Sequence, residues 1–280
     1  MIKLGSNNIG KIYYGTSSIG KVYLGSNLVY GGSSPTPSYT PDSYVQSGLI
    51  SMFDGEWNNG RNSHLSSGLT TWKDLIGSND LTVTTGVTIG DNYLQNTDYS
   101  KSVASKSGAI QTARTIEFVF KLDDADTSAS AFVIANRMDT LNNNTRARGN
   151  FHFNHGSFGN LYFESWGAAT DRRGVPFAIS DRNIHTISAG WETNSAATAG
   201  AVLGYIDGAN ELVSNLNGTG REGAGDNLVI GGLYPYVSVY GTKGKFYCIR
   251  FYNRLLTTQE VLANQAVDAA RFGITLTTNS

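Results

Sequence analysis

Two tryptophans lie in polar segments where an aromatic ring could bind a sugar. Trp57 stands in the run Gly-Glu-Trp-Asn-Asn-Gly, and Trp166 is followed directly by Gly167. Sugars are bound by aromatic rings that cover their C–H faces and by planar polar side chains that reach their hydroxyls. Packing in a core or at its rim explains either tryptophan equally well, because half-buried tryptophan is common.

Arginines near these tryptophans and in other loop segments could bind an acidic polysaccharide through charge-assisted hydrogen bonds. Arg61 lies in the same polar segment as Trp57. The remaining candidates lie in the later predicted loops, and they are Arg146, Arg148, Arg172 and Arg173. Loops on a rigid scaffold are where binding usually occurs, so the two tryptophans and five arginines form the predicted ligand-binding set.

The elements that position these residues are predicted to be mainly β-strands. It has 280 residues, 33 glycines, 15 tyrosines, 12 phenylalanines and only 15% charged residues, a composition typical of short strands joined by tight turns. The clearest predicted strands are Gly48–Phe53, Leu81–Thr84, Thr115–Leu122, Ala131–Asn136, Gly149–Phe153, Asn160–Glu164, Ile184–Glu192, Ala201–Ile206, Leu228–Ile230 and Gly244–Tyr252. We therefore predict an all-β, antiparallel, two-sheet sandwich.

One helix is predicted near the C-terminus. Thr257 and Glu260 have the spacing of a capping box, an apolar stripe starts at Val261, and Gly273 is a natural stop. Asp207, followed by Gly208, is predicted to be a hairpin-turn residue.

The first 31 residues contain an internal repeat with a period of ten. Each unit reads as a short strand followed by a Gly-Ser or Gly-Thr turn, which predicts a small antiparallel β-meander. Alternation places six apolar side chains on one face: Ile2, Leu4, Ile12, Tyr14, Val22 and Leu24. So small a sheet needs a partner surface, so we expect 1–31 to form a homo-oligomer, with a trimer favoured, or to dock onto a larger assembly. An extra sheet packed on the main domain is the alternative.

Composition shifts divide the rest of the chain. Residues 32–43 hold three of the five prolines and are predicted to be a Pro/Ser/Gly linker. Residues 44–273 are predicted to form the sandwich, and 274–280 a tail.

Charge and cysteine content exclude several classes of protein. Lys and Arg number 21 against 22 Asp and Glu, which argues against binding to nucleic acid or to a membrane surface. The lone Cys248 cannot form an internal disulfide, and we expect it to be buried. We find no signal-peptide pattern and no apolar run of about 20 residues, so we expect no membrane insertion.

Several segments resemble the laminin-G-like, concanavalin A-like lectin and glucanase jelly-roll superfamily. They are Gly48–Gly55, Trp72–Gly77, the Tyr-Ile-Asp-Gly run at 205–208, Leu228–Gly232 and Lys245–Thr257. The resemblance implies a carbohydrate site on a concave face or at a rim of loops, and in many members a calcium ion. The repeat and linker resemble the attachment ends of bacteriophage tail or fibre proteins, which implies location in a virion.

Catalysis is not expected from these residues. Retaining glycanases of the resembled architecture place two glutamates on one strand face, whereas Glu117 has no acidic partner two or four residues onward. His152 and His155 would point to opposite faces of a strand and would not share a zinc ion. A calcium ion is more plausible than zinc, because hard cations prefer oxygen ligands and the loops carry oxygen donors.

These observations predict a non-catalytic, glycan-binding adhesion module of a multimeric virion protein. Its expected ligand is a cell-surface polysaccharide. Residues 1–31 would hold it to another virion protein. A purely structural virion protein without a ligand is the main alternative, and a glycoside hydrolase is a third.

Overall fold

A computed structural model describes residues 3–4, 7–8, 12–14, 17–19, 21–24, 27–31, 39–123, 131–138, 150–153, 160–164, 174–179, 181–191, 202–210, 227–232 and 241–277. The chain divides into two compact units, Met1–Thr40 and Pro41–Ser280.

In the first unit, each ten-residue repeat forms a hairpin of its own. The pairs are β1 (Lys3–Leu4) with β2 (Asn7–Asn8), β3 (Ile12–Tyr14) with β4 (Ser17–Ile19), and β5 (Lys21–Leu24) with β6 (Asn27–Gly31). The sequence predicted one strand per repeat in a single meander, whereas the structure has two strands per repeat in separate sheets. The paired ends Leu4 and Asn7 have only two residues between them, which is the commonest length of a hairpin connection, so the chain returns on itself within each repeat.

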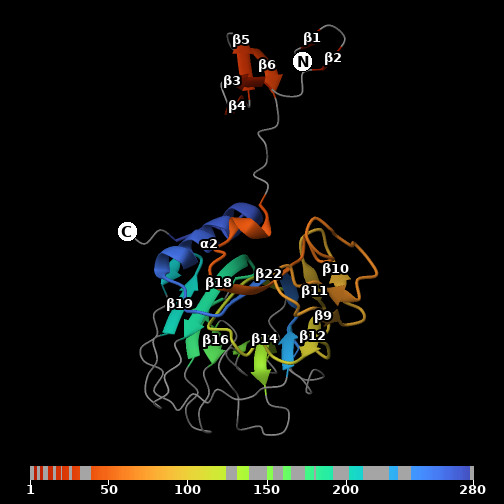
Figure 1. Ribbon diagram of the computed structural model, residues 1–280, viewed down its shortest axis with the longest axis vertical. Coiled ribbons are helices and arrows are strands. Elements are labelled where there is room, and N and C mark those ends of the chain that lie inside the picture. The colour runs from red at the N-terminus through yellow and green to blue at the C-terminus, as the bar shows by residue number, and fades with distance from the viewer. Residues whose placement is uncertain are drawn as a thin grey trace. The chain divides into compact units, whose positions relative to one another are not determined.

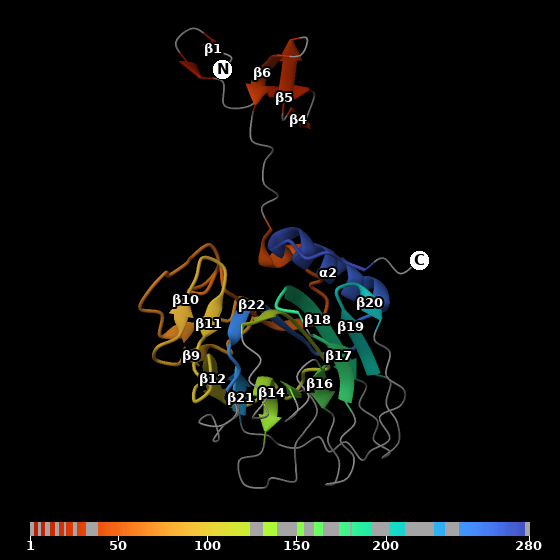
Figure 2. The ribbon, with the colours of Figure 1, turned by 180° about the vertical axis from the view of Figure 1, so that it is seen from behind.

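The second unit is a sandwich of two antiparallel sheets (Figures 1 and 2). The helix-side sheet contains β7 (Leu49–Asp54), β10 (Thr88–Ile89), β11 (Leu94–Asn96), β13 (Thr115–Leu122), β18 (Ile184–Trp191), β19 (Val202–Ile206), β20 (Ala209–Asn210) and β22 (Gly244–Tyr252). The opposite sheet contains β8 (Thr71–Trp72), β9 (Leu81–Val83), β12 (Ala104–Ser107), β14 (Ala131–Met138), β15 (Asn150–Phe153), β16 (Asn160–Glu164), β17 (Gly174–Ala178) and β21 (Asn227–Ile230). A short 3-10 helix, η1 (Pro41–Ser43), precedes the sandwich.

Strand β22 lies at the centre of the helix-side sheet. It pairs with β13 along one edge, and with β7 and β11 in turn along the other. Both faces of this sheet are covered, so β13 is buried almost throughout. Ile116, Phe118 and Phe120 face the core between the sheets, while Glu117 and Val119 alternate toward the other face.

Helix α2 (Thr258–Phe272) covers the outer face of the helix-side sheet. Figures 1 and 2 both show it lying across this sheet, on the side away from the opposite sheet. Thr257 accepts a hydrogen bond from the backbone N–H of Glu260, whose carboxylate accepts one from the N–H of Thr257. Gly273 ends the helix at φ 70°, a left-handed conformation that favours glycine. The predicted helix, its capping box and its stop are confirmed.

Replacing Thr257 by alanine tests the value of this cap. We expect the free energy of unfolding to fall by about 1 kcal/mol, because one helix N–H loses its side-chain acceptor. Urea denaturation measures the change. Thr257→Ser keeps the hydroxyl and is the matched control; an equal loss in both variants would contradict the capping role.

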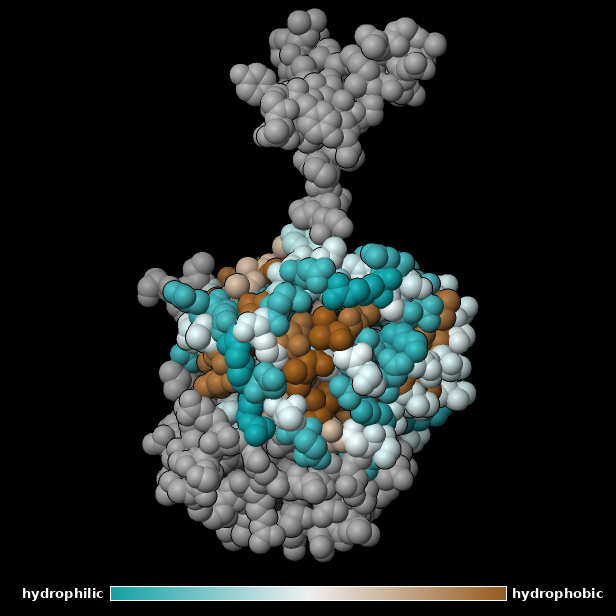
Figure 3. All heavy atoms as spheres, viewed as in Figure 1, coloured by the Kyte–Doolittle hydropathy of each residue, from teal (hydrophilic) through white to brown (hydrophobic). Residues whose placement is uncertain are grey.

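The predicted fold class is confirmed: the chain is mostly β, with two antiparallel sheets and a single C-terminal helix among the described residues. Hydrophilic residues spread over the face of the second unit seen in Figure 3, with apolar residues between them. Within the described ranges, Leu65 is the one large apolar residue classed as exposed, at 38%. No described helix is long and apolar enough to span a membrane.

Candidate functional site

A polar pocket of about 550 Å³ opens where two strands, a hairpin turn and the end of α2 meet. Lys121 of β13 and His185 of β18 both line it, at neighbouring positions of two paired strands where Lys121 pairs with Ile184 and Phe120 with His185. The other lining residues come from the loop before β18, the β19–β20 turn and the chain at the end of α2: Asp181, Arg182, Asn183, Asp207, Phe272, Gly273, Ile274 and Thr275. Cations, carboxylates, an amide and a half-buried aromatic ring therefore share one cavity.

His185 stands between two carboxylates in this pocket. Its Nδ1 lies 2.6 Å from Asp207 Oδ2, and its Nε2 lies 2.7 Å from Asp181 Oδ1. The residue is only 7% exposed. A carboxylate accepts hydrogen bonds and donates none, so both contacts are satisfied only when both ring nitrogens carry hydrogen.

The surroundings of His185 raise its pKa above the ordinary value of 6.5. Burial alone would lower the pKa, but the hydrogen bonds and negative charges of Asp207 and then Asp181 outweigh it. The pKa of Asp181 is correspondingly lowered: burial opposes this shift, and hydrogen bonds from Asn183 and His185 produce it. The surroundings of His185 therefore favour an imidazolium held between two carboxylates.

The β19–β20 turn fixes the Asp207 carboxylate. Asp207 has φ 47°, and its Oδ1 accepts the N–H of Thr186 at 2.9 Å. Gly208, at φ 84°, donates its N–H to Gln265 of α2 at 2.8 Å. A Cβ on Gly208 would lie 2.6 Å from the carbonyl oxygen of Thr277, so this turn is packed too closely for another residue. The prediction of Asp207 as a turn residue agrees with this geometry.

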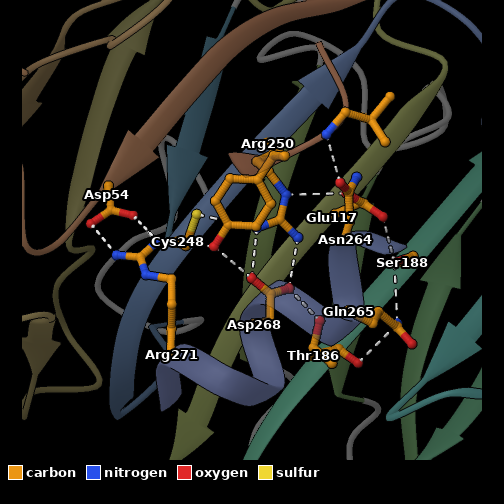
Figure 4. Close-up of polar contacts among 12 residues, drawn as sticks. Asp54, Glu117, Thr186, Ser188, Cys248, Arg250, Asn264, Gln265, Asp268 and Arg271 are labelled. Atoms are coloured by element: carbon orange, nitrogen blue, oxygen red, sulfur yellow. Dashed lines mark hydrogen bonds and ion pairs between the residues drawn. The ribbon is translucent and has the colours of Figure 1, made fainter. Parts of the chain in front are cut away.

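Beneath α2, a buried network of charged and polar side chains holds the helix to the sheet (Figure 4). Arg250 of β22 donates to both carboxylate oxygens of Asp268, at 2.8 and 2.7 Å, and to Glu117 at 3.1 Å. Glu117 also accepts from Asn264 at 2.6 Å and from Ser188 at 2.9 Å. These five residues come from three strands and one helix, and each is at most 1% exposed.

A second buried arginine extends this network. Arg271 of α2 donates to both oxygens of Asp54 on β7, at 2.7 and 3.1 Å, and to the hydroxyl of Tyr44 at 2.9 Å. The Tyr44 hydroxyl in turn donates to Asp268 at 2.9 Å, which joins the two arginine clusters. The network therefore fixes the position of the helix whose C-terminal end forms one wall of the pocket.

Burial governs the ionisation of this network. It raises the pKa of Glu117, with a further contribution from the charge of Asp268, against the opposing effect of Arg250. Burial also raises the pKa of the Cys248 thiol. Cys248 is wholly buried, as expected for a small apolar residue, and its raised pKa leaves little of the reactive thiolate.

The structure places two of the seven predicted ligand-binding residues, and it brings neither to the pocket. Trp57 is 9% exposed and packs in an apolar cluster, with the Arg271 guanidinium 5.0 Å from its ring. Its ring therefore has the packing role that was the alternative to sugar stacking. Arg61 binds Asp42 at 3.0 Å and the carbonyl oxygen of Leu75 at 3.2 Å. The other five lie outside the described residues: Arg146, Arg148, Trp166, Arg172 and Arg173.

Sequence reasoning did not select the pocket residues as ligand-binding groups. A usable pattern was present, since Asp181 precedes His185 by four residues at a strand start, and Asp207 begins an Asp-Gly turn. The described residues contain no group of three or more His, Cys, Asp or Glu arranged to hold a metal ion. Within the described part of the chain, no such group fits the calcium ion that the resemblance implied.

The fold defines the second unit as an antiparallel two-sheet β-sandwich with a helix against the outer face of one sheet. No protein-family model matches the chain, and no curated protein is similar to it in sequence. Solved structures do share its fold. A Trypanosoma rangeli sialidase in complex with sialic acid aligns with a TM-score of 0.56 and 16% identity, over 90% of this chain and 36% of that one.

A second structure of Trypanosoma rangeli sialidase aligns with a TM-score of 0.54 and 15% identity, also over 90% of this chain and 36% of that one. The carbohydrate-binding module CBM40 of a Ruminococcus gnavus sialidase, bound to α2,3-sialyllactose, aligns with a TM-score of 0.40 and 12% identity, over 61% of this chain and 95% of that one. The chain thus spans little more than a third of the length of the trypanosomal sialidases it matches.

These comparisons correct one prediction. The expectation that the chain is not an enzyme is contradicted, because the structures that align at TM-scores of 0.54 to 0.56 are sialidases, which are enzymes. The absence of paired glutamates on one strand excluded a single arrangement, whereas carboxylates can be brought together from different strands. The comparisons contain nothing that supports the resemblance to bacteriophage attachment segments.

Proposed function

We propose that this chain is a glycan-binding β-sandwich domain that binds its ligand in the pocket of Lys121, His185 and Asp207. The observation that carries the proposal is the lining of this cavity, where cations, carboxylates, an amide and a half-buried phenylalanine surround about 550 Å³. Carboxylates accept hydrogen bonds from sugar hydroxyls, an amide can both accept and donate them, and Phe272 offers apolar surface for C–H groups.

Acidic sugars suit this pocket best. Lys121 and Arg182 are both cationic, and the imidazolium of His185 adds a third positive charge against the two carboxylates of Asp181 and Asp207. A charge-assisted hydrogen bond to a sugar carboxylate is roughly twice as strong as a neutral one. The shared fold with a sialidase whose structure contains sialic acid supports the same ligand class.

The sequence alone supports a further part of the proposal. We propose that residues 1–31 assemble several copies, or attach them to a virion component such as a tail or fibre, so that weak single sites gain avidity. The ten-residue repeat and the proline-rich segment after it are the basis for this. Light scattering on the full chain and on a chain lacking 1–31 tests it: an unchanged oligomeric state would contradict self-assembly.

Titration of the full chain with 3′-sialyllactose and with lactose tests the binding site. We expect the sialylated sugar to bind more tightly, and Lys121→Ala to weaken its binding by about tenfold, since a charge-assisted contact is lost. Lys73→Ala is the matched control, because Lys73 is a partly exposed lysine that pairs with Asp80 away from the pocket lining. Equal binding by both variants, or no binding of either sugar, would contradict the proposal.

The same samples should be assayed for released sialic acid, because the fold is shared with enzymes. Release that depends on Lys121 would place turnover, as well as binding, in this pocket.

A further inference from the structure

His185 joins two segments of the pocket wall through its two ring nitrogens. One is the loop 181–183, whose Asp181 accepts from the Nε2 side of the ring. The other is the β19–β20 turn, whose Asp207 accepts from the Nδ1 side. Both segments line the pocket, so the ring bridges two of its walls.

This bridge exists only for the doubly protonated ring. A neutral imidazole has one N–H, so one of its nitrogens would present a lone pair to a carboxylate oxygen less than 3 Å away. Without the contact to His185, Asp207 would still accept a hydrogen bond from the N–H of Thr186, and it is held in a tight turn. Asp181 has a side chain that is 53% exposed, and its remaining donors are the N–H and amide of Asn183 within its own loop. Asp181 is therefore the partner more easily lost on deprotonation, and with it the contact that holds the loop 181–183 to the ring.

We propose that protonated His185 is a positioning residue that clamps the loop 181–183 to the β19–β20 turn, so that the pocket is assembled while the ring carries both protons and loosens when the ring loses one. This rests on the proposed function only where it concerns sugar binding, because the clamp itself is independent of any ligand.

The other charged groups around His185 in the described part of the chain define its setting. Lys121 on the adjacent strand β13 and Arg182 in the loop oppose protonation, while Asp181 and Asp207 favour it. From α2, Asp268 accepts the hydroxyl of the neighbouring Thr186 but is neutralised by its bidentate pairing with Arg250. The two carboxylates in direct contact dominate, which agrees with the raised pKa of His185.

The sign of the pH dependence follows from that shift. A group whose pKa is raised on folding contributes stability that is fully present below its unfolded pKa, here about 6.5. That contribution is lost as the pH rises through the higher folded pKa of His185. The clamp is therefore closed below about pH 6.5 and opens as the pH rises through the folded pKa of His185.

Ring NMR of the full chain without ligand, from about pH 5 to about pH 9, is the direct test. His185→Gln assigns the His185 signals among those of the four histidines. We expect His185 to titrate above 6.5, and the Asn183 amide to lose about tenfold in hydrogen-exchange protection, relative to its intrinsic rate, over the same range. Titration at or below 6.5, or unchanged protection of Asn183, would overturn the clamp.

Two aspartate variants separate the clamp from a merely structural role. Asp181→Asn removes the charge that faces Nε2, so we expect the His185 titration and the loss of Asn183 protection to move together to lower pH. Asp98→Asn is the matched control: Asp98 is an exposed aspartate that binds Ser100 within its own turn. A His185 titration that is the same in Asp181→Asn as in the unaltered chain would overturn the proposal.

Binding of 3′-sialyllactose at about pH 6 and about pH 9 then links the clamp to the site. We expect binding to weaken severalfold at the higher pH, and Asp181→Asn to shift this change downward. If NMR shows the clamp and no sugar binds at either pH, the glycan function fails and the clamp stands. If sugar binds equally at both values while the loop stays protected, the clamp fails and the glycan function stands.

Discussion

Replacing Arg250 by methionine is expected to lower the free energy of unfolding by about 3 to 5 kcal/mol. The guanidinium is wholly buried and neutralises two carboxylates, Glu117 and Asp268, that are themselves wholly buried. Methionine fills a similar volume but leaves both carboxylates without their counter-charge. Since a domain of this kind is stable by only about 5 to 15 kcal/mol, the change removes a large fraction of the total.

Urea denaturation followed by circular dichroism measures this loss. Lys73→Met is the matched control, because the Lys73–Asp80 pair has side chains 43% and 39% exposed and contributes about 0 to 1 kcal/mol. A triple variant that combines Arg250→Met with Glu117→Gln and Asp268→Asn removes the buried charges together, and we expect it to recover part of the stability. Equal losses for Arg250→Met and Lys73→Met would show that the buried network does not anchor α2.

Replacing Trp72 by alanine is expected to cost about 3 to 5 kcal/mol, because it leaves a cavity in the core between the sheets. The side chain is fully buried, and its ring lies 5.8 Å from that of Phe53 at an angle of 60°. Its Nε1 donates to the carbonyl oxygen of Asp54 at 2.9 Å, so the variant also leaves a buried acceptor without its donor.

Two further variants separate these contributions. Trp72→Phe keeps most of the ring and loses the donor, so we expect a smaller loss than for alanine. Leu65→Ala, at a position 38% exposed, should change stability by no more than about 0.5 kcal/mol. A Trp72→Ala variant as stable as Leu65→Ala in thermal and urea unfolding would contradict the packing role.

Composition and the regular recurrence of strand-like runs were sufficient to predict the sandwich. Each of the ten predicted strands overlaps an observed one, because a strand that packs on one or both faces leaves a pattern in its own sequence. The helix was equally predictable, because its capping box, its apolar face and the glycine that ends it are all set by residues close together in the sequence. Short edge strands such as β8 and β20, two residues each, leave no such pattern and were missed.

The polar clusters could not be predicted because their members are far apart in the chain. Glu117 meets Arg250 and Asn264 only after β13, β22 and α2 have packed together. His185 meets Asp207 across a strand and a turn whose pairing the sequence does not specify. Trp57 shows the converse error: a polar stretch of sequence indicated a loop, yet the ring inside that loop turns inward and packs beside Arg271.

The central place of β22 has a consequence for synthesis on the ribosome. Strand β7 (Leu49–Asp54) and strand β13 both pair with β22, which begins at Gly244 and is followed by the helix that covers them. Chains are made at about 5 to 20 residues per second, so the early strands emerge many seconds before their partner exists. During that interval their unpaired backbone edges and apolar side chains are open to other nascent chains, and we expect chaperone binding to be greatest just before Gly244 is translated.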